Sequence, residues 1–115
     1  MSDHDDRLPM LQMLEIAQQG LEVVGSRTRN SIHTDRLLQL ALCHVILITG
    51  EAATRVSDAG RARHPDVPWA KAIAARNFIA HGYDRIDYDV VWDTIADHFP
   101  SLITALDQAL ASYPS

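Results

Sequence analysis

Residues 35–58 read DRLLQLALCHVILITGEAATRVSD, and this stretch decides the fold. Its first half is apolar on nearly every side of a helix, through Leu37, Leu38, Leu40, Ala41, Leu42, Val45, Ile46, Leu47 and Ile48. A helix with that pattern is surrounded by other helices or by a partner subunit. The stretch therefore predicts a long central helix over about residues 35–58, which Gly60 stops, followed by a loop over residues 61–67.

A second helix is predicted before this central one. Residues 1–8 are polar and charged, and we expect them to form a loose arm. The helix starts near Pro9, because proline suits a first helical turn. One apolar stripe then recurs at helical spacing up to Val24, and a polar loop over residues 26–34 leads into the central helix.

The rest of the chain predicts two or three more helices. One runs from Pro68 or Trp69 to about His81, where Gly82 stops it. The next begins at the N-cap Asp87, Pro100 breaks or restarts the chain, and a last helix carries apolar residues up to Tyr113. No alternation typical of strands is present. We therefore predict one all-α domain over residues 1–115, an up-down bundle of four to five helices whose short connections make neighbours antiparallel.

Composition limits the classes of function. The chain has 115 residues, 47% of them hydrophobic and 22% charged, which suits one soluble globular domain. Its net charge of -5 argues against a protein that coats nucleic acid through a broad basic surface, although a small pocket of arginines stays possible. The single cysteine, Cys43, is expected in the core. We see no signal peptide, and the apolar run around residues 37–50 is interrupted and too short for a membrane span, so a cytoplasmic protein is expected.

Arg76 is out of place on the helix predicted before Gly82. At about 100° per residue, it falls in the middle of the apolar side formed by Trp69, Ala72, Ile73, Ile79 and Ala80. An arginine there must be paired, line a cleft or serve an interface. His81 lies about 140° away, so an ideal helix does not bring it to Arg76, although a helix that ends at Gly82 can re-aim it. A purely structural interpretation pairs Arg76 with Glu51 and lets His81 cap the helix.

Residues 76–83 read RNFIAHGY, and this segment resembles the R-x-x-x-x-H-x-Y motif of HepT-like proteins, a branch of the HEPN superfamily. Further blocks resemble the family in the same order. They are GEAA at residues 50–53, PDVPW at residues 65–69, and Asp87 followed by Val91-Trp92. Together these blocks span most of residues 36–110.

The resemblance implies a homodimeric, metal-independent endoribonuclease toxin without a cofactor, in which the two motif helices form a shared cleft. Arg76 and His81 would be its catalytic residues, with Asn77, Tyr83 and Glu51 in support. It also implies a partner, a minimal nucleotidyltransferase of the MntA type that acts as antitoxin by adenylylating Tyr83. The chemistry is consistent, since RNA carries its own nucleophile and needs only proton transfer and charge stabilisation. The phosphate added to Tyr83 would block the cleft and neutralise Arg76.

Other interpretations stay open. The same cleft could belong to a non-catalytic helical module that binds a nucleotidyltransferase or a nucleotide. Arg85 and Lys71 can add positive charge for RNA, or can simply be solvated. His44 shares a face with Glu51 and is expected to make a core hydrogen bond, while Trp69 and Trp92 are expected in the core. The remaining histidines have no metal-ligand spacing, so no metal site is predicted: His4, His33, His64 and His98.

Overall fold

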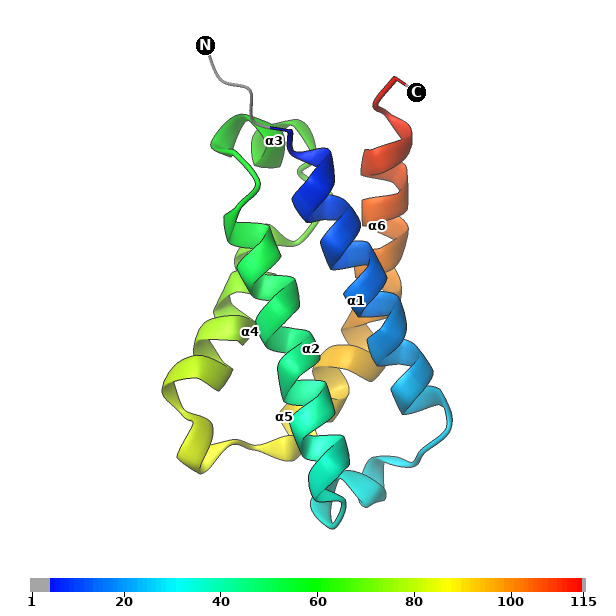
Figure 1. Ribbon diagram of the computed structural model, residues 1–115, viewed down its shortest axis with the longest axis vertical. Coiled ribbons are helices and arrows are strands. Elements are labelled where there is room, and N and C mark those ends of the chain that lie inside the picture. The colour runs from blue at the N-terminus through cyan, green and yellow to red at the C-terminus, as the bar shows by residue number, and fades with distance from the viewer. Residues whose placement is uncertain (1–4, 115) are drawn as a thin grey trace.

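The computed structural model describes residues 5–114, and every regular element in that range is helical (Figure 1). The side chain of Tyr83 also lies outside the description. The long helices are α1 (Arg7–Gly25), α2 (Arg36–Thr54), α4 (Trp69–His81) and α6 (Phe99–Ala111), and the short ones are α3 (Asp58–Arg63) and α5 (Tyr88–Asp93). Two 3₁₀ turns, η1 (Arg29–His33) and η2 (Tyr83–Arg85), and one π-helical segment, η3 (Thr94–His98), join them.

The successive long helices run in alternating directions, so the predicted all-α, up-down bundle is confirmed (Figure 1). α2 packs along both α1 and α4, and α1 also packs along α6. Large side chains from α1, α2, η3 and α6 close the core: Met10, Met13, Leu42, Ile95 and Leu106. Trp69 and Trp92 are buried as expected. The bundle therefore places α2 at its centre, with α4 as an outer helix that presents one side to solvent.

The predicted bounds of the central helix are wrong at its end. α2 ends at Thr54, and a separate helix, α3, begins at Asp58. The Ser57 hydroxyl caps α3 by accepting a hydrogen bond from the Gly60 backbone N–H at 3.0 Å, so Gly60 lies inside a helix instead of stopping one. A serine cap satisfies N–H groups at a helix start and so favours a new helix there. The spacing of apolar residues does not reveal this break, because the cap depends on the Ser57 hydroxyl and leaves the apolar pattern unchanged.

The start of the chain also differs from the expected loose arm over residues 1–8. Residues 1–4 lie outside the described range, but α1 already begins at Arg7. Asp6 accepts hydrogen bonds from both the backbone N–H and the hydroxyl of Ser57, at 2.8 and 2.7 Å. The described end of the arm is therefore anchored to the start of α3.

Of the two predicted roles of Pro100, a break or a restart, the structure shows no break, and α6 starts with Pro100 in its first turn. α5, η3 and α6 form one continuous helical segment over residues 88–111, and Pro100 lies in the first turn of α6. Proline lacks the N–H that an interior helical position would use. The π-helical turn just before Pro100 uses i→i+5 hydrogen bonds in place of i→i+4 bonds. This change in the hydrogen bonds lets the helix continue through Pro100.

α2 keeps part of its apolar surface exposed. Leu37 is 78% exposed and Leu40 is 51% exposed, whereas Leu38, Leu42 and Ile46 are buried. At 19 residues, α2 is long and apolar enough to cross a membrane by length and composition alone, contrary to the expectation that its apolar run is too short. About half of that stretch is buried against other helices of the bundle. Cys43 lies half-buried beside the core, where burial raises the pKa of its thiol.

Candidate functional site

α4 approaches α2 most closely at Gly50. A Cβ atom placed on Gly50 would lie 2.2 Å from the Arg76 Cβ and 2.7 Å from the Ala72 carbonyl oxygen. These distances are too short for any side chain, so only glycine allows the two backbones to come this close. The contact sets the root of the Arg76 side chain directly against α2.

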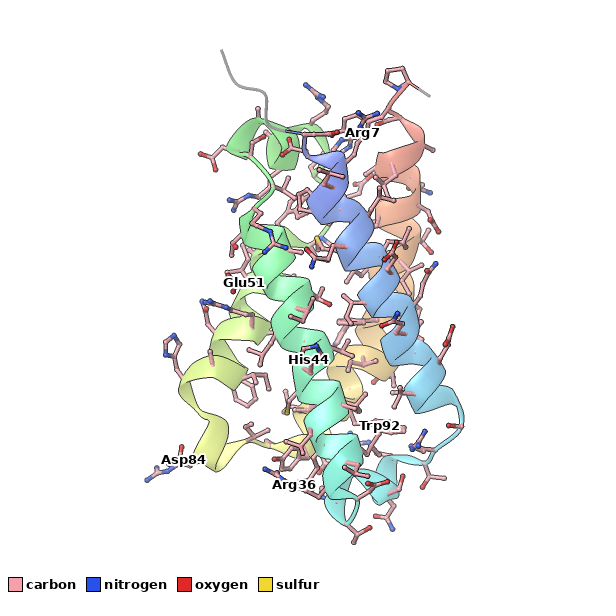
Figure 2. All side chains as sticks on the ribbon, viewed as in Figure 1. Arg7, Arg36, His44, Glu51, Asp84 and Trp92 are labelled. Atoms are coloured by element: carbon pink, nitrogen blue, oxygen red, sulfur yellow. The ribbon has the colours of Figure 1, made fainter. Side chains whose placement is uncertain are left out.

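This close contact explains why an arginine can occupy the apolar side of α4. The Arg76 guanidinium runs along α2 to Glu51, whose carboxylate accepts from Nε at 3.1 Å and from Nη2 at 2.8 Å. Figure 2 shows Glu51 on α2, together with His44. The Arg76 side chain is 32% exposed and that of Glu51 is 46% exposed. The pair therefore lies at the solvent border of the α2–α4 contact, and the predicted partnership of Arg76 with Glu51 is present.

Asn77 completes the contacts of the guanidinium. Its side-chain oxygen accepts a hydrogen bond from Arg76 Nη1 at 2.9 Å. A guanidinium carries five N–H groups, and these contacts with described residues use three of them. Two N–H groups on a fixed, planar cation are thus available to a ligand that accepts in a fork, such as a phosphate.

His81 is the last residue of α4 and is exposed. α4 remains regular up to this residue, and Gly82 ends it by donating its backbone N–H to the Phe78 carbonyl at 3.1 Å. Gly82 therefore does not re-aim His81 toward Arg76, as we had expected it could. Asn77 lies one helical turn before His81 on the same face. The described geometry thus connects Arg76 to the His81 side of α4 through Asn77.

The other predicted site residues lie as follows. Tyr83 begins η2, two residues after His81, and its side chain lies outside the described part of the chain. His44 is exposed on α2, so the expected core hydrogen bond is wrong. Among the described residues, no three His, Cys, Asp or Glu side chains gather as a metal site requires.

The arrangement offers two chemical abilities near the end of α4, joined through Asn77. Arg76 can bind a phosphate and stabilise negative charge that develops on it. His81, the last residue of α4, carries an imidazole that can donate or accept a proton. The key role of Gly50 was not predicted from its position in the sequence, although a glycine inside an apolar helix is the kind of signal that marks a close backbone approach.

Comparison with known proteins assigns this chain to a family. The family model described as "Ribonuclease HepT-like" matches residues 13–109. The chain is 26% identical over 102 residues to "Putative RNase MJ1380" of Methanocaldococcus jannaschii, which covers 89% of this chain and 94% of that protein. It is 29% identical over 93 residues to "Probable ribonuclease HepT" of Thermococcus cleftensis, which covers 77% of this chain and 84% of that protein. No solved structure matches the chain at the same level of significance.

Proposed function

Because this chain belongs to the HepT-like ribonuclease family, we propose that it is an endoribonuclease toxin that cleaves RNA without a metal ion. The observation that carries the proposal is the Arg76 guanidinium, which Glu51 and Asn77 hold while two of its N–H groups remain unused by the described residues, with Asn77 one turn before His81. Asn77 and His81 thus share one exposed face of α4, which we call the motif face, and the Arg76 guanidinium is bound to Asn77 at its border.

The cleavage step needs no added nucleophile. The 2′-hydroxyl oxygen of RNA attacks the adjacent phosphorus, the bond from phosphorus to the 5′-oxygen breaks, and the 3′ end becomes a cyclic phosphate. Arg76 binds the phosphate and stabilises the charge on its oxygens. His81 transfers a proton, either from the 2′-hydroxyl or to the leaving 5′-oxygen. Two such protons move, and a single chain has one His81.

A homodimer would supply the second histidine. Leu37 and Leu40 on α2 and Phe78 on α4 are exposed, so both helices present apolar side chains at the surface. An exposed apolar surface of this kind is typical of a protein–protein interface. We infer that two copies pack through this surface and bring their α4 helices to a shared cleft.

The test is RNA cleavage by the purified chain in EDTA, with no partner protein present. We expect a single-stranded RNA to be cut, and the same oligonucleotide with a 2′-deoxy sugar at the cut position to resist. His81→Ala should slow cleavage by about 10²–10⁴-fold, and Arg76→Ala by about 10²–10³-fold.

His33→Ala is the matched control, because His33 is exposed on η1 and pairs with Asp89 away from α4. It should cleave at the wild-type rate. Cleavage that requires a metal ion, or that survives in His81→Ala, would contradict the proposal. Circular dichroism of each variant separates loss of activity from loss of fold.

We further propose that a nucleotidyltransferase switches the toxin off by adenylylating Tyr83. The backbone of Tyr83 follows His81 by two residues, so a phosphate attached there would stand close to the motif face. Intact mass after incubation with the MntA-type partner and ATP should rise in adenylyl units in the wild type and stay constant in Tyr83→Phe. The modified chain should no longer cut RNA. A mass gain that persists in Tyr83→Phe would assign the modification to another residue.

The second candidate function is a non-catalytic module that binds the nucleotidyltransferase or a nucleotide through the same face. The Arg76–Glu51 ion pair favours this second candidate, because an arginine bound to a carboxylate can have a purely structural role. This candidate predicts a stable complex and intact RNA in the EDTA assay.

A further inference from the structure

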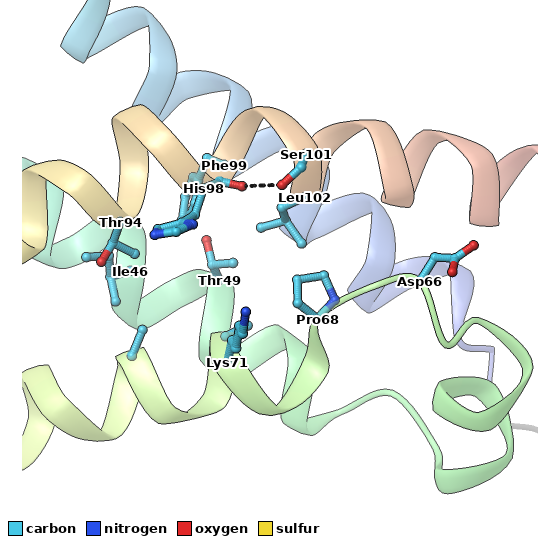
Figure 3. A pocket seen from close by; sticks show the side chains of 12 residues that line it. Ile46, Thr49, Asp66, Pro68, Lys71, Thr94, His98, Phe99, Ser101 and Leu102 are labelled. Carbon is cyan, nitrogen blue, oxygen red and sulfur yellow. Dashed lines mark hydrogen bonds between the residues drawn. The ribbon is translucent and has the colours of Figure 1, made fainter.

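A cavity of about 400 Å³ lies between α2, α4 and the helical segment formed by η3 and α6 (Figure 3). Small side chains make room for it, namely Ala72 and Ala75 on α4 and Thr49 on α2. The volume lies within the range of roughly 300–1,000 Å³ that is typical of sites for small organic molecules. This cavity is therefore large enough to hold one.

The wall of the cavity is mostly apolar. Ile46, Phe99 and Leu102 line it, and all three side chains are buried in the core. They belong to helices held in place by the rest of the bundle, so the wall is preformed. A rigid apolar wall of this kind suits a flat ring.

Polar groups converge in the middle of the cavity, between Ile46 and Pro68 (Figure 3). Figure 3 shows the Lys71 amine from α4, the Thr49 hydroxyl from α2 and the His98 imidazole from η3 directed into the same region. Thr49 is 2% exposed, and its hydroxyl donates to the Val45 carbonyl at 2.7 Å, which leaves its oxygen able to accept. Asp66 lies beyond Pro68, at one end of the cavity (Figure 3).

Lys71 carries the charge of this polar region. It is the one lysine of the chain, and it forms no ion pair with any residue that the structure describes. An ammonium ion with a histidine and a threonine beside it can hold a phosphate by charge and by hydrogen bonds. The cavity thus combines an apolar wall with a site for an anion.

The cavity lies on the side of α4 away from Asn77, although Ala72, which lines it, stands one turn before Arg76. Ala75, which lines the cavity, and Asn77 lie about 160° apart around α4. A ligand in the cavity would therefore contact the side of α4 away from Asn77, while Arg76 remains on Glu51.

We propose that this cavity binds a nucleotide, with the base against Ile46, Phe99 and Leu102 and the phosphate on Lys71, His98 and Thr49. A free nucleoside monophosphate and a nucleotide unit of bound RNA share this chemistry. The proposal concerns binding at a second site, so its test does not depend on whether the chain cleaves RNA.

Because the chain has a single lysine, acetylation of Lys71 gives a direct readout by peptide mass spectrometry. The probes are the four common nucleoside 5′-monophosphates, the corresponding nucleosides, and a short single-stranded RNA added to the His81→Ala variant, which keeps the RNA intact. We expect a monophosphate or the RNA to protect Lys71, and the nucleosides, which lack the phosphate, to protect it about tenfold more weakly. Protection by the monophosphate identifies a free nucleotide as ligand, and protection by RNA alone identifies a nucleotide unit of the substrate.

Ala75→Leu fills the cavity and should abolish protection without removing any charge. Ala74→Leu makes the same change at an exposed position on α4 outside the cavity lining, and it should leave protection intact. Circular dichroism shows whether each variant folds. Absence of protection by every probe, or equal protection in Ala75→Leu and wild type, would overturn the proposal.

Discussion

At the scale of single residues, Gly50 and Arg76 depend on each other. The missing Cβ of Gly50 admits the base of the Arg76 side chain, and Glu51, the next residue on α2, receives its guanidinium. The ion pair is partly exposed, and such pairs contribute roughly 0–1 kcal/mol to stability. Its main consequence is therefore geometric, because it fixes the cation that the proposed reaction uses.

Gly50→Ala should lower the free energy of unfolding. The added methyl group would meet the Arg76 Cβ and the Ala72 carbonyl, and overpacking of this kind costs about 1–3 kcal/mol. That cost opposes the gain of roughly 1 kcal/mol that alanine brings inside a helix. Urea denaturation followed by circular dichroism measures the difference, and RNA cleavage should fall as Arg76 shifts.

Gly25→Ala is the matched control, since a Cβ at Gly25 would meet no atom within 4 Å. It should leave the unfolding free energy unchanged or slightly raised. A Gly50→Ala variant as stable as Gly25→Ala would show that α4 does not need the close approach.

At the scale of elements, hydrogen bonds at helix ends decide where helices begin, and apolar periodicity does not. Periodicity located α1, α2, α4 and the last helical segment, because each buries one continuous stripe. It missed the break before α3, which depends on Ser57, and the π-helical turn that carries the chain past Pro100. Both features rest on a few backbone hydrogen bonds that leave the apolar pattern unchanged.

Ser57→Ala should destabilise the protein by about 1–2 kcal/mol. The substitution removes the cap on Gly60 and one of the two hydrogen bonds to Asp6, so the start of α1 and α3 should loosen together. Hydrogen exchange at the amides of α1 and α3 locates the loss. Ser26→Ala, at an exposed hydroxyl after α1, should change stability by less than about 0.5 kcal/mol; equal effects of the two changes would argue against a role for the cap.

At the scale of the whole molecule, the bundle leaves the apolar surface of α2 uncovered. The sequence predicted a helix enclosed by other helices or by a partner subunit, and one chain supplies only part of that enclosure. The exposed leucines lie on the same helix that holds Gly50 and Glu51. Dimerisation through this surface would therefore join the two motif faces.

The double variant Leu37→Asp, Leu40→Asp should be monomeric and folded, because both side chains lie outside the core. In analytical ultracentrifugation the wild type should have twice the mass of one chain, and the variant should have the mass of one chain. The variant should also lose most of its RNA cleavage. Leu11→Asp, at a leucine on α1 that is 42% exposed, should remain a dimer. A monomeric wild type that cleaves RNA would refute the shared cleft.

The sequence by itself determined the helical class, the positions of the long helices and the family motif, because these depend on residue type and on spacing within one segment. It also marked Arg76 as an anomaly, since an arginine on an apolar stripe requires a partner. Only the tertiary structure decided the contact of Gly50 with α4, the link from Arg76 through Asn77 toward His81, and the cavity beside Lys71. Each of these features depends on how closely two backbone segments distant in the sequence approach each other. Side-chain packing sets that distance, and the spacing of apolar residues within one segment does not predict it.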